Sequence, residues 1–248
     1  MKSDIEVQEL IKSCGNNYVR LLQKLGVLYI RPKRVLEPIG PLVGRQSTYS
    51  NPDIKREPLH YVSENYYNGK VLLLYPTVIK HLAQAILEKM QPQSAIRQMT
   101  FRGLAPGGEM LAHFLELEMK KLPGLQGLIG SENGQDKVVL VQDILDPMQL
   151  KKAIEVTQKI KKEIFFVCAI IEPDRCFDGF VHASQGPIVL ITLIKELLVR
   201  YQQDHPLVKE DVDNGNIVWD PKNDWDLLAK VIEEADIEPE KVQQRLVV

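Results

Sequence analysis

An uninterrupted aliphatic run near the middle of the chain gives the clearest structural signal in the sequence. Residues 138–141 are Val-Val-Leu-Val, and they lead into Gln142, Asp143 and, after two more apolar residues, Asp146 and Pro147. A continuous apolar run bounded by turn residues is typical of a strand that is buried on both faces of a parallel sheet. The sequence therefore predicts a central strand here, with polar residues at its carboxyl end.

The residues that follow predict a helix and a second buried strand. Between 149 and 160 apolar residues recur at helical spacing, and Asp146 and Pro147 are a good N-cap and a good first helical residue. Residues 164–171 are again continuously apolar. Strand, helix and strand at this spacing make one right-handed βαβ unit. Because ligands of open α/β sheets bind beyond the carboxyl ends of the strands, we expect a site near residues 142–143 and 172–175.

The rest of the chain extends this alternation. Residues 204–216 read as a polar loop, and residues 105–108 as a tight turn. Helices that alternate with strands favour an α/β fold with a mainly parallel sheet flanked by helices. The other expected elements are a strand at 95–104 and helices at 4–25 (broken near Gly15), 76–90, 109–121, 187–203, 223–237 and 239–246.

A long stretch from residue 30 to residue 68 does not fit the alternation. It is dense in Pro, Gly, Ser, Asn and Arg, and it is too long for a plain connection. It is a functional loop, a set of short irregular strands or a partly disordered segment, and its basic residues, such as Arg31, favour a solvated surface. We expect an α/β domain at 1–184 with an irregular, hood-like region at 30–70, and a helical extension at 185–248 packed on that domain.

Composition narrows the class of protein. The chain has 248 residues and a net charge of -2, so no global field would attract nucleic acid. Three cysteines without metal or redox spacing, and no signal peptide, favour a reducing, cytoplasmic setting. The most apolar window is too short to span a bilayer, and Lys195 and Glu196 interrupt it. We therefore predict neither a membrane segment nor a metal site made by the protein alone.

The order of these features resembles the type I phosphoribosyltransferases, and within them the orotate phosphoribosyltransferases, over roughly residues 18–180. Residues 103–108 are similar to the Gly-x-x-x-Gly-Gly loop that receives pyrophosphate. Residues 138–149 fall at the family signature of four apolar residues, two acids, two apolar residues and Thr-Thr-Gly. Asp174 and Arg175 fall where the family carries Asp-Arg, and residues 57–63 are similar to its Ser-Pro-x-Tyr-x-Asp segment.

This resemblance implies a phosphoribosyl pyrophosphate donor with Mg²⁺, and a homodimer. In the family the acid pair holds the ribose hydroxyls, and the Thr-Thr-Gly turn holds the 5′-phosphate at a helix N-terminus. In this chain Gln142 replaces the first acid, while Asp146, Pro147 and Met148 replace Thr-Thr-Gly. Asp146 places a negative charge where the phosphate dianion would bind, and it satisfies the helix terminus itself.

Two functions are compatible with these residues, so they leave open whether the chain is an enzyme. In the first, the chain is a divergent orotate-type phosphoribosyltransferase that uses the diphosphate donor and Mg²⁺. In the second, the same fold has lost its active site and serves ligand sensing or protein–protein interaction. The first function assigns Asp143 as the catalytic residue and gives substrate binding to Gln142, Asp146, Gly107, Gly108, Asp174 and Arg175.

Overall fold

The chain forms two compact units. The computed structural model describes residues 2–34, 37–46, 60–90, 99–121, 137–173, 177, 179–184, 186–196 and 200–237. The first unit combines Met1–Tyr18 with Gly69–Leu197, and the second combines Val19–Asn68 with Leu198–Val248. The second unit is therefore discontinuous in sequence, in contrast to the predicted division of the chain at residue 184.

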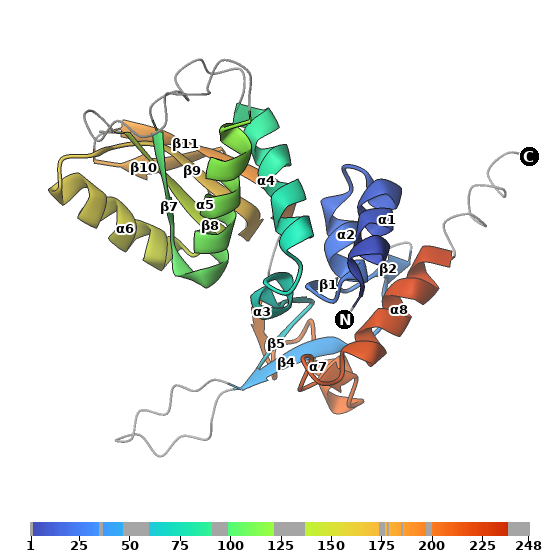
Figure 1. The fold of residues 1–248 in the computed structure, drawn as a ribbon. Helices are drawn as coiled ribbons and strands as arrows, with labels where there is room; N and C mark the ends of the chain where they lie inside the picture. The colour runs from blue at the N-terminus through green and yellow to red at the C-terminus, as the bar shows by residue number, and fades with distance from the viewer. Residues whose placement is uncertain are drawn as a thin grey trace, which may run out of the picture. The chain divides into compact units, whose positions relative to one another are not determined.

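The first unit is built on a five-stranded sheet in the order β10-β11-β9-β8-β7 (Figure 1). Neighbouring strands pair in parallel, except that β10 pairs antiparallel with β11. A mixed α/β fold with a mostly parallel sheet flanked by helices was predicted, and it is confirmed. The elements are α1 (Asp4–Cys14), α3 (Gly69–Leu72), α4 (Pro76–Met90), β7 (Met99–Gly103), α5 (Ala105–Met119), β8 (Lys137–Ile144), α6 (Pro147–Lys159), β9 (Glu163–Pro173), β10 (Phe180–Ala183) and β11 (Gly186–Glu196).

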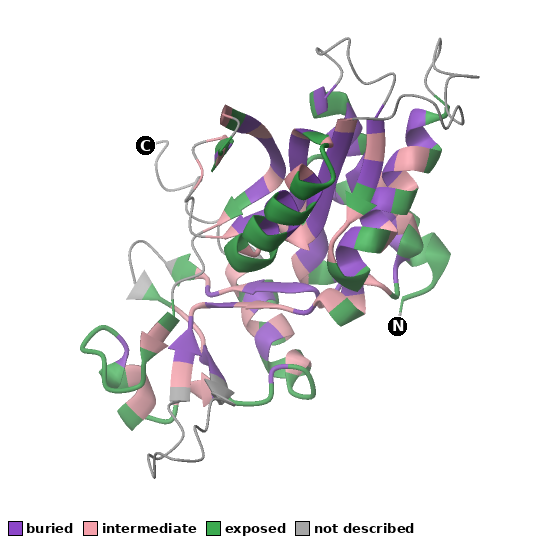
Figure 2. Cartoon of the chain, turned by 90° about the vertical axis from the view of Figure 1, so that its left-hand side faces the viewer, coloured by how far each residue is buried: buried purple, intermediate pink, exposed green. Residues whose placement is uncertain are grey.

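Helices cover both faces of this sheet. Val138 and Leu140 of β8 pack in one cluster with Leu150 and Ile154 of α6. Since neighbouring strand residues point to opposite faces, the alternate residues, such as Val141, face the side where α5 contacts β7 and β8. Figure 2 shows the strands largely buried and the outward side of α6 exposed. The described helices include none that is long and apolar enough to cross a membrane.

The predicted helix at 187–203 is wrong. Residues of this stretch form β11, which pairs in parallel with β9 so that Ile191 lies opposite Cys168, and a further short strand at Arg200–Gln202. The stretch is rich in β-branched residues, which pack well on a pleated surface. A continuous apolar run of this length does not distinguish a buried strand from a buried helix by periodicity.

The second unit contains a four-stranded sheet in the order β12-β5-β4-β13 and two small strand pairs, β1 with β6 and β2 with β3. Of the three alternatives for residues 30–68, short irregular strands are found in the described part of that stretch. The predicted helix at 223–237 is confirmed, and the predicted helix at 239–246 lies outside the described residues. The elements are α2 (Tyr18–Lys24), β1 (Leu28–Ile30), β2 (Lys33–Arg34), β3 (Glu37–Pro38), β4 (Leu42–Gln46), β5 (His60–Ser63), β6 (Asn65–Tyr67), β12 (Arg200–Gln202), α7 (Lys209–Asp213), β13 (Ile217–Val218) and α8 (Trp225–Ile237).

A buried ion pair joins the two sequence segments of the second unit. Arg31 is 5% exposed, and its Nη1 and Nη2 donate to the two carboxylate oxygens of Asp211 at 2.9 and 2.7 Å. Arg31 Nε donates to the Gly40 carbonyl at 2.9 Å, and Asn216 Nδ2 donates to Asp211 Oδ1 at 2.7 Å. Burial alone would raise the pKa of Asp211, but the hydrogen bonds from Arg31 and Asn216 lower it. Arg31 is thus a structural residue, and the prediction that it lies on a solvated surface is wrong.

We predict that Arg31→Ala destabilises the second unit by about 3 kcal/mol, because it leaves a mostly buried carboxylate unpaired. Urea unfolding followed by tryptophan fluorescence measures this loss. Lys33→Ala is the matched control: Lys33 is paired with Glu64 at 3.5 Å but is 57% exposed, so its loss should cost no more than about 0.5 kcal/mol. Equal effects of the two substitutions would contradict the structural role of Arg31.

One histidine of the first unit, His81, is partly buried. His81 of α4 lies beside Tyr18, with ring centroids 6.0 Å apart, and it forms a hydrogen bond with the backbone of Gly15. Its Nε2 is buried and has no hydrogen-bond partner among the described residues. Burial lowers the pKa of His81 below its usual value of 6.5, although the Gly15 bond and the charge of Glu88 oppose this shift.

We predict that the free energy of unfolding falls as the pH drops below about 6.5. The unfolded chain then takes up a proton that the folded chain accepts only at lower pH, so stability is lost between the two pKa values. Thermal melts at pH 7.5 and 5.5 measure the loss. In His81→Phe the part of the stability loss at low pH that is due to His81 should disappear. If the stability of this variant depends on pH as in the native protein, His81 is not the cause of the loss.

Candidate functional site

The predicted site residues that the structure describes lie together at the carboxyl edge of the parallel sheet. Gln142 and Asp143 lie at the end of β8, and Gly103, at the end of β7, pairs with Val141. The loop after β7 leads directly into α5, and the loop after β8 leads directly into α6. The first turns of both helices therefore lie next to the polar end of β8.

The first turn of α5 packs directly on the end of β8. A Cβ atom added to Gly108 would lie 2.4 Å from the carbonyl oxygen of Val141, and one added to Gly107 would lie 2.2 Å from Asp143 Oδ2. Both glycines are buried and belong to the helix, which begins at Ala105, so the predicted tight turn at 105–108 is instead the start of α5. The two glycines serve close packing between backbones, with the Asp143 carboxylate against Gly107.

The chain enters α5 through an unusual backbone conformation. Ala105 has φ = 61°, and it follows Leu104, whose N–H donates to the Val141 carbonyl at 2.8 Å. A positive φ is uncommon for a residue with a Cβ atom. The conformation turns the chain sharply from β7 into α5, which brings the two glycines onto β8.

Side-chain oxygens of Asp146 and Gln142 accept the backbone N–H groups at the N-terminus of α6. Asp146 Oδ1 accepts hydrogen bonds from the backbone N–H groups of Met148 and Gln149 at 2.9 and 3.1 Å. Gln142 is 2% exposed, and its Oε1 accepts the N–H of Asp146 at 3.2 Å. The predicted N-cap role of Asp146 is confirmed, and Pro147 at the first helical position has no N–H to offer. The hydrogen-bond donors that would hold a phosphate are engaged by a carboxylate.

A buried carboxylate, Glu172, lies near the end of β9, within the range 172–175 where the sequence predicts a site, although the sequence analysis assigns it no role. Glu172 is fully buried, and it accepts hydrogen bonds from the Phe177 N–H at 3.2 Å and from Thr192 Oγ1 at 3.4 Å. Lys195 Nζ lies 3.5 Å from Glu172 Oε2. These contacts fix the chain after β9 against β11. An acidic residue that ends an apolar run is the signal that could have identified it, but the wrong helix prediction for 187–203 hid Thr192 and Lys195.

A second lysine reaches the same strand. Lys89 of α4 donates to the Thr192 carbonyl at 2.6 Å, and burial together with the charge of Lys195 lowers the pKa of Lys89.

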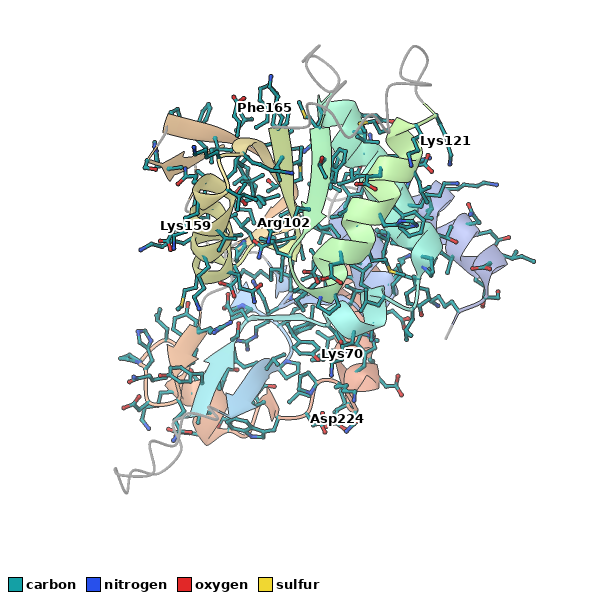
Figure 3. All side chains as sticks on the ribbon, turned by 60° about the vertical axis from the view of Figure 1, so that its left-hand side comes forward. Lys70, Arg102, Lys121, Lys159, Phe165 and Asp224 are labelled. Atoms are coloured by element: carbon teal, nitrogen blue, oxygen red, sulfur yellow. The ribbon has the colours of Figure 1, made fainter. Side chains whose placement is uncertain are left out.

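Lys121 lies far from the predicted site. It follows the end of α5, which runs from the carboxyl ends of the strands toward their amino ends. It therefore lies at the opposite edge of the sheet from Asp143 (Figure 3).

Asp174 and Arg175 lie outside the described residues, so their substrate-binding role stays a prediction. Within the described ranges, no group of three His, Cys, Asp or Glu side chains is placed to hold a metal ion. The Mg²⁺ that the resemblance implies stays a prediction, and at the start of α6 the N–H groups of Met148 and Gln149 are already engaged by Asp146.

Comparison with known proteins does not assign a family. No family model and no curated protein matches the sequence. Among solved structures, UMP synthase of Leishmania donovani is similar at 13% sequence identity with a TM-score of 0.45. The match covers 91% of this chain and 43% of the UMP synthase chain, so the chain spans less than half of that protein's length.

We predict that Gly108→Ala destabilises the first unit by about 3 kcal/mol, since its Cβ would meet a backbone carbonyl that cannot move without disturbing the sheet. Gly215→Ala is the matched control: Gly215 has φ = 69° with open space around it, so only backbone strain of about 1 kcal/mol is expected. Chemical denaturation measures both. A Gly108→Ala variant as stable as the native protein would show that α5 and β8 do not pack as described.

Proposed function

We propose that this chain is a phosphoribosyltransferase-like α/β protein that does not transfer phosphoribosyl groups and acts through binding instead. The observation that supports this proposal is the engagement of the Met148 and Gln149 N–H groups by Asp146. In a donor site those groups would bind a 5′-phosphate. An intact Asp146 carboxylate about 4 Å from a phosphate charge would add about 4 kcal/mol of repulsion at an effective dielectric constant of 20.

The packing at α5 supports the same proposal. Pyrophosphate recognition by a Gly-Gly loop depends on space for an anion above the backbone. Here a carboxylate oxygen of Asp143 lies against Gly107, and the Val141 carbonyl lies against Gly108. Both nearest groups are oxygen acceptors, which repel an anion. The two positions that would receive the two ends of the diphosphate donor are thus both lined by acceptors.

The alternative is a divergent orotate-type transferase. It would use Asp143 to orient the ribose, and Mg²⁺ would arrive with the diphosphate. The convergence of Gln142, Asp143 and Gly107 at one sheet edge is the observation in its favour. In this alternative Asp146 must leave its cap to admit a phosphate, which would cost about 1 kcal/mol in addition to the repulsion. The homodimer stays a prediction in both cases, and light scattering on the purified chain would test it.

We predict that titration of the purified protein with phosphoribosyl pyrophosphate and Mg²⁺ gives no saturable heat up to millimolar ligand. The triple variant Asp146→Thr, Pro147→Thr, Met148→Gly removes the charge, supplies two hydroxyl groups and adds one N–H donor. It should gain measurable binding of the same ligand. Met148→Ala alone is the control and should not gain it, because Asp146 still occupies the helix terminus.

Micromolar binding by the native chain would contradict the proposal and favour the transferase. In that case, release of pyrophosphate in the presence of orotate and of other bases is the assay that identifies the acceptor. The melting temperature of each variant must first be shown to be close to that of the native chain, so that a missing heat signal reflects the site rather than the fold.

A further inference from the structure

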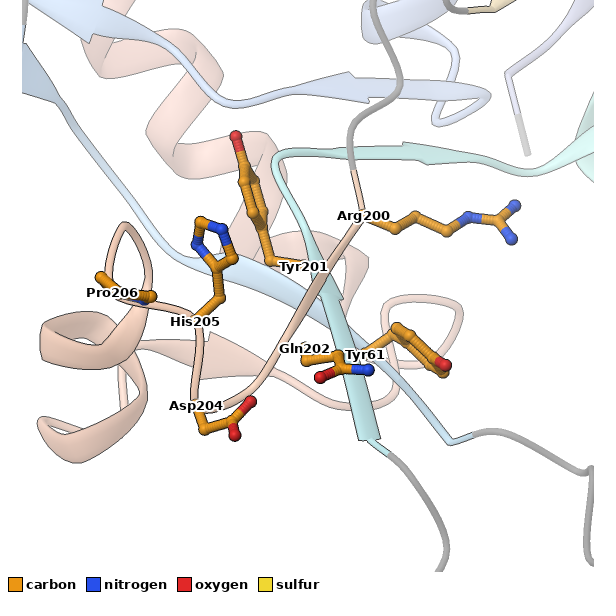
Figure 4. A pocket seen from close by; sticks show the side chains of 7 residues that line it. All are labelled: Tyr61, Arg200, Tyr201, Gln202, Asp204, His205 and Pro206. Atoms are coloured by element: carbon orange, nitrogen blue, oxygen red, sulfur yellow. The ribbon is translucent and has the colours of Figure 1, made fainter.

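A hollow of about 660 Å³ lies beside the edge strand of the second unit (Figure 4). Strand β12 ends the order β12-β5-β4-β13, and the turn that follows it forms part of the wall. Arg200, Gln202 and Asp204 are exposed, so this is an open hollow at the surface and not an enclosed cavity. The hollow is lined by Tyr61, Arg200, Tyr201, Gln202, Asp204, His205 and Pro206, which all belong to the second unit.

The strand register places a cation, an aromatic ring and an amide on one face of the β12–β5 pair. Gln202 is the direct cross-strand partner of Tyr61, and Arg200 is the partner of Ser63, two residues along β5. Tyr61 therefore has Gln202 opposite and Arg200 as its diagonal neighbour, within reach of long side chains. Figure 4 shows Arg200 and Tyr61 extending away from the rings of Tyr201 and His205.

Contacts on the other face of β12 hold Tyr201 and His205 in place. The rings of Tyr201 and His205 lie 5.0 Å apart, and Tyr201 packs against the cluster that contains Leu42 and Val62. His205 Nδ1 accepts the N–H of Leu207 at 3.3 Å, and the backbone N–H of His205 donates to the Gln202 carbonyl at 3.0 Å. These contacts fix the backbone of β12 and of the turn after it, whereas Arg200 and Gln202 project from the other face of the strand.

The polar groups of three residues at the hollow form no hydrogen bond or ion pair with the other described side chains, and we test them below as contacts for an external partner. In the described part of the chain, no hydrogen bond or ion pair engages the guanidinium group of Arg200, the amide of Gln202 or the carboxylate of Asp204. A guanidinium group binds a phosphate through two parallel N–H donors. A side-chain amide both donates and accepts, so it can pair with the edge of a heteroaromatic base. A tyrosine ring offers a stacking surface to such a base.

We propose that this hollow binds a free nucleoside monophosphate, with the base against Tyr61 and Gln202 and the phosphate on Arg200. The proposal goes beyond the function proposed above, because that concerns residues of the first unit only. A free nucleotide is favoured over a nucleic-acid strand, since the net charge of -2 and the carboxylate of Asp204 at the rim disfavour a polyanion. If it is correct, the second unit is a nucleotide-binding module.

The test is isothermal titration of the full chain with 5′-AMP and 5′-UMP at 50 mM salt. Adenosine and uridine serve as probes without a phosphate. At least one nucleotide should bind, and Arg200→Ala should weaken its binding by about tenfold, to the level of the matching nucleoside. Tyr61→Leu keeps a packed side chain but removes the stacking ring, and it should weaken the nucleotide and the nucleoside alike. Lys222→Ala, an exposed cation of the same unit outside the hollow, should leave binding unchanged.

Three results would overturn the proposal. The first is that neither nucleotide binds at millimolar concentration. The second is that Arg200→Ala and Lys222→Ala weaken binding equally, since the phosphate would then be attracted by general charge and not by this hollow. The third is that a decamer of uridylate binds more than tenfold tighter than 5′-UMP, because the natural partner would then be a single-stranded nucleic acid.

Discussion

The contact between α5 and the end of β8 is the constraint on which the rest of the first unit depends. Gly108 permits the helix backbone to approach the Val141 carbonyl, and Ala105 adopts a left-handed conformation to start that approach. In other α/β proteins such a close approach serves an anion that binds between helix and strand. In this protein it brings the helix onto the strand itself, so the same glycines that suggest a ligand loop serve packing.

At both ends of the predicted donor site, a carboxylate of the protein lies at the N-terminus of a helix. At α6 the Asp146 carboxylate accepts the N–H groups, and at α5 the Asp143 carboxylate lies against the glycine backbone. Each carboxylate lies at a helix N-terminus, where the helix dipole and the free N–H groups favour negative charge. The protein therefore supplies from its own sequence the charge that a phosphorylated ligand would otherwise bring.

Local features of the fold were predictable from sequence, and contacts between distant residues were not. The strand at 138–141, the helix after it and the Asp146 cap depend on neighbouring residues, so their patterns predict them. The strand at Gly186–Glu196 was mistaken for a helix because its apolar run has no period. The role of Arg31 depends on Asp211, which lies 180 residues away, and the hollow beside β12 depends on a strand pairing between Tyr61 and Gln202. No local pattern carries that information.

The pairing of Arg31 with Asp211 has a consequence for how the chain is made. Most of the first unit, Gly69–Leu197, lies in sequence between the two segments of the second unit, so the N-terminal segment of the second unit emerges from the ribosome long before the C-terminal one. Residues 19–68 must wait, with apolar surface exposed, until residues 198–237 are synthesised, while the first unit is free to fold during that delay. The order of the two units along the chain thus favours an order of folding, in which most of the first unit is synthesised before Asp211 can pair with Arg31.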